Sequence, residues 1–339
     1  MMTTRRPWLL LGLVAAALSP AASRPLDAQP AAKVYRIGML EGAEVISNAE
    51  NLAAFRDRLR GLGYVEGQHY VLELRSAEGR PQRLPDLAAE LASLPVDVMV
   101  TRGSPAALAA KHATRTIPIV MASSGDPSAE GIAANLARPD GNVTGFHILV
   151  PLEVGATRLR LLKEAVPGAA RVGILWNSVD IHGPLLVRET ARVAPGLGVA
   201  LKSLELPRAW PSRPGAAFDQ VFEAAMMDQV DALIAVEGSV MFNERARLVA
   251  FAAMSRLPAI YGLREFVEAG GLMSYGTDRR DLHRRAADKV HRVLQGARPS
   301  DLPIEPPTRF ELVINLRTAR MLGLTIPSSL LQRADHVVE

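Results

Sequence analysis

The chain has 339 residues, of which 48% are hydrophobic and 22% charged, and it contains no cysteine. This composition excludes a largely disordered protein and is typical of a folded chain with one large hydrophobic core or two of ordinary size. The lack of cysteine excludes thiol catalysis, cysteine metal ligands and disulfides. The formal net charge of +4 is too small to indicate a nucleic-acid-binding protein.

Residues 1–28 are typical of a secretory signal peptide. Two arginines precede an apolar run over residues 8–18, and small residues follow it. The run is too short for a comfortable membrane span, although an uncleaved anchor is the alternative. Cleavage after Ser23 or Ala28 is expected, and the later cut removes three arginines and one aspartate, which lowers the net charge from +4 to +2. We therefore expect a soluble periplasmic protein, exported by the general or the twin-arginine route.

Short apolar runs alternate with helix-length amphipathic segments from residue 34 onward. This order predicts parallel sheets covered by helices on both faces. Three of the runs recur about 135 to 140 residues later: "RVGILWN" resembles "RIGMLEG", "VDALIAVEGSV" resembles "VDVMVTRGSP", and "LPAIYG" resembles "IPIVMA". We therefore predict an α/β protein with two similar doubly wound parallel-sheet lobes. One long doubly wound sheet is the alternative.

Extended or proline-rich segments in three places are suited to hinge crossings between the lobes. They are residues 136–151, 270–281 and 304–316. The predicted lobes are residues 33–144 with 276–304, and residues 145–275 with 305–339. Three crossings would leave a cleft between the lobes that closes on a ligand.

Four stretches carry a resemblance to a known protein family. They are "LRGLGYVEGQHYVLELRSAEG", "LPVDVMVTRGSPAALAAKHAT", "IPIVMASSGDPSAEGIAANLARPDGNVTG" and "FELVINLRTARMLGLTIPSSLLQRADHVVE". The chain resembles the substrate-binding proteins of ABC importers with the type I periplasmic-binding fold, in the group that includes tryptophan- and phenylalanine-binding receptors. The resemblance implies a receptor, not an enzyme, that captures a small amino-acid-like or carboxylated organic ligand by hinge closure. An inner-membrane ABC permease is the implied partner, and we expect a monomer.

Small polar turns follow strands at corresponding positions in the two lobes, at residues 103–105 and 237–239. Parallel sheets bind ligands beyond the carboxyl ends of their strands. Ser104 fits a helix N-cap followed by proline at the first helical position, so capping alone explains it. On a cleft wall, the free N–H groups of that helix start would bind an anion. We predict that Ser104, Glu237 and Ser239 contribute to the ligand site.

The segment "ASSGDP" follows another buried strand and supplies two hydroxyls and a carboxylate, from Ser123, Ser124 and Asp126. A simple turn in which Asp126 caps the next helix is the alternative. If the ligand is an amino acid, Asp126, Glu237 or Asp278 would receive its ammonium group, while serine hydroxyls and helix N-termini would bind its carboxylate.

Aromatic residues make up only 5% of the chain, so their positions are informative. Trp176 and Tyr261 end predicted strands, and Tyr275 lies in a predicted crossing. Aromatic rings in such places stack on apolar or aromatic ligand groups. Packing at the lobe edges is the alternative, and we favour Trp176 and Tyr261 as ligand contacts.

Arg102 stands beside the first predicted cleft turn. If its side chain points inward, the cationic cleft edge favours an anionic or zwitterionic ligand, whereas an outward side chain carries no such meaning. The seven histidines are dispersed, and no dinucleotide, Walker or nucleophile-elbow motif stands in the right context. We therefore expect no metal and no cofactor. A type I-fold ligand sensor without a transport role and an exported enzyme are the rival functions.

Overall fold

The computed structural model describes residues 33–178, 182–206 and 214–339. The predicted signal peptide, residues 1–28, lies outside the described residues. The chain divides into Met1–Lys33 and Val34–Glu339, and every element below belongs to the second of these units. Among the helices of the described residues, none is both long enough and apolar enough to cross a membrane.

The first lobe is built on a parallel sheet that has six strands in the described part of the chain. In spatial order they are β2 (Tyr70–Ser76), β1 (Tyr35–Glu41), β3 (Val98–Arg102), β4 (Ile119–Ser124), β5 (Val143–His147) and β11 (Ile304–Glu305). The inner strands β3 and β4 are buried along their whole length. Such burial is expected where helices cover both faces of a parallel sheet.

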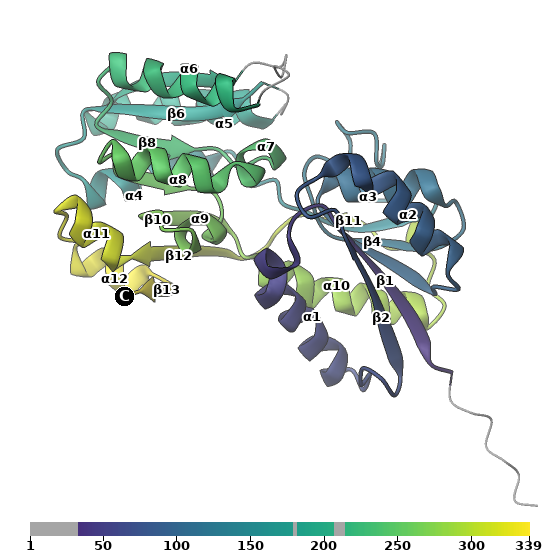
Figure 1. Ribbon diagram of the computed structural model, residues 1–339. Helices are drawn as coiled ribbons and strands as arrows, with labels where there is room; N and C mark the ends of the chain where they lie inside the picture. Colours follow the sequence, from purple (N-terminus) through teal and green to yellow (C-terminus); the bar gives the residue numbers. More distant parts are fainter. Residues whose placement is uncertain (1–32, 179–181, 207–213) are drawn as a thin grey trace, which may run out of the picture. The chain divides into compact units, whose positions relative to one another are not determined.

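Helices cover the two faces of this sheet (Figure 1). They are α1 (Ala49–Gly61), α2 (Leu84–Ser93), α3 (Ser104–Ala113) and α10 (Arg279–Leu294), with 3₁₀ turns η1 (Val45–Asn48), η2 (Pro81–Arg83) and η4 (Pro299–Asp301). On one face, Phe55 of α1 and Val290 of α10 join Val98 in a buried cluster. On the other face, Leu91 of α2 and Ala110 of α3 pack in a second cluster. The two clusters make this lobe doubly wound.

The second lobe is built on a seven-stranded sheet, counted over the described residues. In spatial order its strands are β7 (Ala200–Leu206), β6 (Arg171–Asn177), β8 (Ala232–Ala235), β9 (Ala259–Tyr261), β10 (Met273–Thr277), β12 (Phe310–Asn315) and β13 (His336–Val338). Neighbouring strands are parallel except β10 and β12, which pair antiparallel. The antiparallel pair arises because β12 enters this sheet from the first lobe and runs back beside β10.

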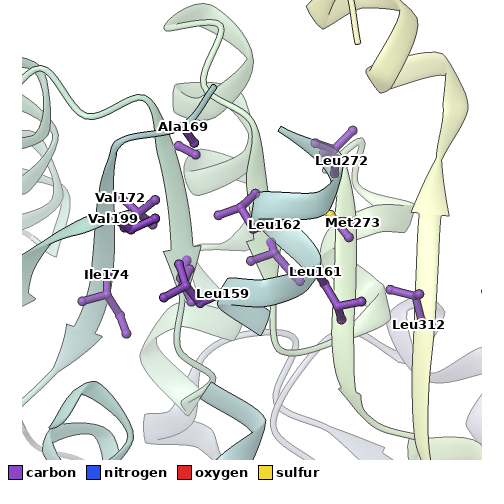
Figure 2. Close-up of a cluster of buried hydrophobic side chains, with 14 of the residues drawn as sticks. Leu159, Leu161, Leu162, Ala169, Val172, Ile174, Val199, Leu272, Met273 and Leu312 are labelled. Carbon is purple, nitrogen blue, oxygen red and sulfur yellow. The ribbon is translucent and has the colours of Figure 1, made fainter. Parts of the chain in front are cut away.

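Helices also lie on both faces of the second sheet. They are α4 (Glu153–Ala165), α5 (His182–Val193), α6 (Pro214–Met227), α7 (Ser239–Asn243), α8 (Arg245–Met254), α9 (Arg264–Glu268), α11 (Leu316–Leu322) and α12 (Ser328–Arg333), with the 3₁₀ turn η3 (Pro195–Leu197). Figure 2 shows one core, in which Leu159 and Leu162 of α4 lie against Val172 and Ile174 of β6. The opposite core takes its side chains from α6, α8 and α9, including Phe218.

The first five strands of each lobe share one spatial order. The order β2-β1-β3-β4-β5 in the first sheet corresponds to β7-β6-β8-β9-β10 in the second. The predicted pair of similar doubly wound lobes is therefore confirmed, and the alternative of one long sheet is wrong.

The chain crosses between the lobes three times, as predicted: from β5 to α4, from β10 to α10, and from β11 to β12. Hydrogen bonds tie the crossings together. Thr277 Oγ1 donates to the carbonyl of Ile148 at 3.3 Å, and Asp278 N donates to the carbonyl of Arg309 at 3.0 Å. The strands β5, β10 and β11 end at residues 147, 277 and 305, whereas the predicted divisions stand at 144, 275 and 304. The lobe boundaries stay a prediction.

Candidate functional site

A cavity lies at the carboxyl ends of strands from both lobes. The empty space at this site, counted together with open solvent, totals about 650 Å³. In the first lobe its lining comes from the ends of β3 and β4, from the segments that follow β1, β3 and β5, from η2, and from the first residues of α2 and α10. In the second lobe it comes from α7 with the residue before it and from Leu263, the second residue after β9. The lining residues are Gly42, Ala43, Pro81, Leu84, Arg102, Gly103, Pro105, Ser123, Ser124, Ile148, Gly238, Phe242, Asn243, Leu263 and Arg279. This is the place where parallel α/β sheets bind ligands.

Gly103, not Ser104, caps the start of α3. Its φ of 84° lies in the left-handed region, which favours glycine, and Ser104 is the first helical residue. The predicted N-cap role of Ser104 is therefore wrong. The Ser104 hydroxyl lies 3.0 Å from the Ser124 hydroxyl and accepts a hydrogen bond from Gly125 N at 2.7 Å. Ser104 thus positions Ser124, which lines the cavity.

Arg102 points inward, and its side chain is only 4% exposed. Its Nη1 lies 3.6 Å from Glu41 Oε2, and the other oxygen of Glu41 accepts a hydrogen bond from Asn48. Burial lowers the pKa of Arg102 to about 10, and the nearby Arg279 guanidinium contributes to that shift. Arg102 therefore stays charged at neutral pH. It makes this cavity wall cationic.

Phe242 of α7 is surrounded by three arginines. The guanidinium carbons of Arg102 and Arg279 each lie 5.2 Å from the centre of its ring, and that of Arg245 lies 4.8 Å away. Arg102 and Arg279 belong to elements of the first lobe, so these cation–π contacts cross between the lobes. Sequence reasoning missed Phe242 and Arg279. The one available signal was the position of Arg279, directly after Asp278 in a predicted crossing.

Arg279 also connects the cavity to α9 of the second lobe. Its Nη1 donates to Glu265 Oε1 at 2.8 Å, and its Nη2 donates to Ser123 Oγ at 3.3 Å. Ser123 and Arg279 both line the cavity, whereas Glu265 lies outside the lining. A ligand that contacts Arg279 would therefore touch a group already bound to both lobes.

Glu237 is held away from the cavity lining by a buried arginine. Arg158 Nη1 of α4 donates to Glu237 Oε2 at 2.5 Å, and Arg158 Nε donates to the carbonyl of Tyr275 at 2.7 Å. Gly262 lies against this pair, and a Cβ there would collide with the Glu237 carboxylate. A Cβ at Gly276 would collide with the carbonyl of Gly262 and crowd Arg158. The structure places the neighbouring residue, Gly238, on the cavity wall.

The two predicted aspartates accept hydrogen bonds from nearby backbone, and only Asp278 caps a helix, because no described helix follows Asp126 before β5. Asp126 Oδ1 accepts hydrogen bonds from the backbone of Ser128 and Ala129, both at 3.0 Å. Asp278 is the N-cap of α10 and accepts from Asp281 N at 3.0 Å. Neither aspartate is among the described lining residues. Ser239 begins α7, but its side chain lies outside the described part of the structure.

The three predicted aromatic residues pack into the second lobe. Trp176 donates from Nε1 to Ser203 Oγ at 2.8 Å and borders the α4 core. Tyr261 stacks on Phe266 with ring centres 4.8 Å apart, and burial raises its pKa. The ring of Tyr275 lies 6.3 Å from that of Phe310. None of the three appears in the described cavity lining, where Phe242 is the aromatic residue.

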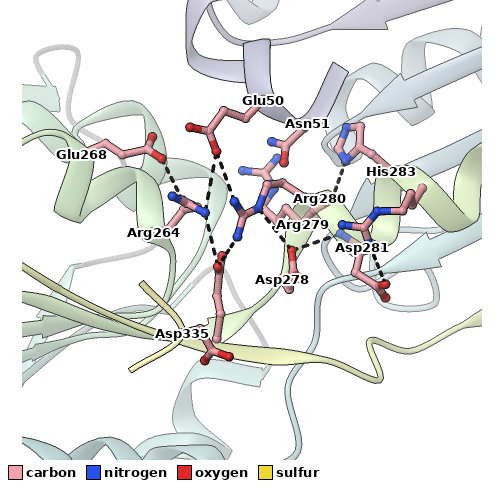
Figure 3. A network of polar contacts seen from close by, with 12 residues as sticks. Glu50, Asn51, Arg264, Glu268, Asp278, Arg279, Arg280, Asp281, His283 and Asp335 are labelled. Carbon is pink, nitrogen blue, oxygen red and sulfur yellow. Dashed lines mark hydrogen bonds and ion pairs between the residues drawn. The ribbon is translucent and has the colours of Figure 1, made fainter. Parts of the chain in front are cut away.

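A second group of charges joins the lobes beside the crossings (Figure 3). Arg264 of α9 lies 3.7 Å from Glu50 of α1, and Arg280 of α10 donates to Glu311 of β12 at 2.9 Å. Glu311 also lies 3.4 Å from Arg264. Burial raises the pKa of Glu311 to about 7, against the opposing effect of Arg264.

Residues 40–338 match the model of the ABC transporter substrate binding protein family. The chain belongs to this family. The members of the family are substrate-binding receptors and not enzymes, so the receptor function predicted from the sequence is confirmed. The substrate-binding protein works with an ABC permease, and such proteins act outside the cytoplasm.

Proteins similar to this chain include a tyrosine-binding protein and an ABC domain solved in complex with L-Trp. A tyrosine-binding protein of Clostridioides difficile is 23% identical over 292 residues, which cover 86% of this chain and 82% of that protein. The structure of an ABC domain in complex with L-Trp from Streptococcus pneumoniae is similar, with a TM-score of 0.76 and 26% identity over 90% of this chain and all of that one. A conserved domain protein from Vibrio cholerae has a TM-score of 0.75, also with 26% identity and the same coverage.

Proposed function

We propose that this protein is a periplasmic receptor that captures a small amino-acid-like or carboxylated organic ligand in the cavity between its lobes and presents it to an ABC permease. The observation that carries the proposal is the pair of buried arginines, Arg102 and Arg279, in the cavity wall. Guanidinium groups bind carboxylates through charge-assisted hydrogen bonds. The hydroxyls of Ser123 and Ser124 lie at the same wall and supply further hydrogen bonds.

The relatives support a ligand of this chemical class. One relative is named as a tyrosine-binding protein, and another was solved in complex with L-Trp. Both amino acids carry a carboxylate next to an apolar body. The cavity of this protein combines cationic and apolar walls, since Leu84, Ile148 and Leu263 also line it.

Hinge closure is the proposed mechanism of capture. A ligand that contacts both lobes stabilises the arrangement in which they lie together, because it binds that arrangement more tightly than any other. Arg102 reaches Phe242 from the opposite lobe, so the ligand would join a contact that already spans the cavity. The permease would then recognise the ligand-bound form. We further propose that the protein works as a monomer and binds no nucleic acid.

Export through a cleaved signal peptide completes the proposed function. The basic start and apolar run within residues 1–28 support it. The transport role is favoured over a ligand sensor by the family to which the chain belongs.

A thermal-shift screen tests the receptor function and the site together. The purified protein is screened against amino acids, organic acids and aromatic carboxylates. A ligand at about one hundred times its Kd adds about 2.7 kcal/mol to the unfolding free energy, which is an easily measured shift. We expect at least one compound to stabilise the wild-type protein and to lose its effect in the Arg102→Gln variant.

The matched control is Arg298→Gln, which removes an arginine whose side chain is 77% exposed and paired with Asp301. The compound should still stabilise this variant. Equal stabilisation of all three proteins would place the ligand away from Arg102 and contradict the proposed site. Because Arg102 is buried, Arg102→Lys serves as a second variant that keeps the charge and tests whether guanidinium geometry is required.

A further inference from the structure

The charges around Phe242 do not balance. Three arginines approach its ring, Arg102, Arg245 and Arg279. Two carboxylates pair with them: Glu41 lies 3.6 Å from Arg102, and Glu265 accepts from Arg279 at 2.8 Å. Three positive and two negative charges leave an excess of one positive charge in this cluster. One negative charge on a ligand would balance it.

The two arginines of this cluster that line the cavity each have a buried donor without a partner. Arg102 Nε and Arg279 Nε are buried and have no hydrogen-bond partner among the described residues. Both arginines line the cavity, whereas neither Glu41 nor Glu265 belongs to its described lining. Buried N–H groups without acceptors are costly, and charged ones more so. A ligand carboxylate between the two guanidinium groups would accept hydrogen bonds from them and reduce the repulsion between their charges.

The cavity lining offers no comparable acceptor for an ammonium group. The described lining contains no acidic side chain. Glu237 binds Arg158 through Oε2, and its other oxygen has no partner among the described residues, but Glu237 lies outside the described lining. Asp126 also lies outside it and accepts from backbone N–H groups. An α-ammonium group would lie within a few ångströms of its own carboxylate, and therefore close to Arg102 and Arg279. Like charges at such distances repel strongly where water is largely excluded.

We propose, on the basis of the proposed function, that the ligand is a monocarboxylate with an apolar body and without an α-ammonium group. Its carboxylate lies between Arg102 and Arg279, and its apolar body contacts Leu84, Ile148 and Leu263. This class differs from the zwitterionic amino acids named for the relatives. It is defined by the excess positive charge of the cluster around Phe242 and by the absence of a carboxylate from the described lining.

Matched ligand pairs that differ only in the α-ammonium group test this inference. The pairs are 3-phenylpropanoate with phenylalanine, and 4-methylpentanoate with leucine. Isothermal titration calorimetry measures all four against the wild-type protein. We expect the acid of at least one pair to bind at least tenfold more tightly than its amino acid. 2-Phenylethylamine, which keeps the ammonium group and lacks the carboxylate, should not bind.

Two variants locate the interaction. Arg279→Gln should weaken binding of the acid by at least tenfold, and Arg298→Gln, an exposed control, should leave it unchanged. Because Arg279→Gln also leaves Glu265 without a partner, the double variant Arg279→Gln/Glu265→Gln keeps the pair neutral and should show the same loss of affinity.

The outcomes separate this inference from the proposed function. Equal or tighter binding of an amino acid overturns the monocarboxylate class but leaves the receptor function in place. If none of the four compounds binds, the inference is also overturned, and the wider screen of organic acids and amino acids decides the receptor function by itself. If the acids bind wild type and Arg279→Gln with equal affinity, the ligand carboxylate does not lie at the proposed position.

Discussion

Arg279 and Glu265 form a buried ion pair, 2.8 Å long, that joins α10 of the first lobe to α9 of the second. Their side chains are 8% and 5% exposed. Arg279 also lines the cavity, so a single guanidinium contacts the proposed ligand site, a serine of the first lobe and a carboxylate of the second. Ligand binding and lobe contact therefore depend on the same side chain.

Replacement of Glu265 by glutamine should destabilise the protein. The change leaves the Arg279 charge buried without its partner, and loss of one member of a buried pair costs about 3 to 5 kcal/mol. Urea unfolding measures the change in free energy. The matched control is Asp301→Asn, which breaks the exposed Arg298 pair and should cost about 1 kcal/mol or less. Equal effects in the two variants would contradict the structural role of the buried pair.

Replacement of Glu237 by glutamine distinguishes a structural residue from a ligand contact. In the structure Glu237 is bonded to Arg158, which is fully buried. We therefore expect a loss of about 3 kcal/mol or more in unfolding free energy, with ligand affinity changed less than threefold in the folded protein. Unfolding measurements and calorimetry report the two quantities separately. A large loss of affinity at unchanged stability would instead support the ammonium-binding role predicted from the sequence.

Glu311 should make stability fall as pH rises from about 4.5 to 7. Burial raises its pKa to about 7 in the folded protein from an ordinary value of 4.5. In that window the folded state binds more protons than the unfolded state, so this contribution is fully present below pH 4.5 and is lost above pH 7. Urea unfolding of wild type and Glu311→Gln across pH 4 to 8 measures the contribution of Glu311 as the difference between their unfolding free energies at each pH.

Glu305 is the control for that experiment, because its pKa is shifted in the opposite direction to that of Glu311. Burial opposes its ionisation, but the hydrogen bonds and positive charges of Lys289 and Arg285 together outweigh burial and lower its pKa. Its contribution is present at neutral pH and is lost as pH falls through its lowered folded-state pKa. The difference in unfolding free energy between wild type and Glu305→Gln should therefore shrink on acidification. The corresponding difference between wild type and Glu311→Gln should grow. Parallel curves for the two variants would refute the assignment for Glu311.

A methyl group at Gly276 should disrupt the contact between the crossings and the second core. A Cβ at this position would collide with the carbonyl oxygen of Gly262. Overpacking of this kind costs about 1 to 3 kcal/mol, and a clash with backbone falls at the upper end. Gly168→Ala is the control, because a Cβ there meets nothing within 4 Å. Thermal unfolding should show a large drop for Gly276→Ala and almost none for Gly168→Ala.

The fold was predictable because the buried strands of the two lobes have similar sequences in the same order. "RIGMLEG" and "RVGILWN" became β1 and β6, which occupy equivalent positions in the two sheets. The antiparallel pairing of β12 with β10 was not predicted. Its direction depends on where the chain re-enters the second lobe, and the local pattern of residues 310–315 carries no information on that point.

The candidate site was predictable in its place but less so in its residues. The strand-end turns around Ser104 and Ser123 do lie at the cavity, because strand ends follow from the sequence pattern. Trp176 shares a strand face with Val172 and Ile174, so strand alternation already pointed it toward the core. The approach of Arg102 and Arg279 to Phe242 joins three segments far apart in the chain. Only the folded structure could bring them together.

The position of α10 in the chain also fixes the order in which the lobes can be finished. This helix covers one face of the first sheet, where Val290 packs with Phe55, yet it follows the whole run of strands β6 to β10. A ribosome making this chain therefore completes β10 of the second lobe before it supplies the last helix and the edge strand of the first. Until then the apolar face around Phe55 lacks its cover. The first lobe thus becomes complete only after β11, which ends at Glu305, has been synthesised.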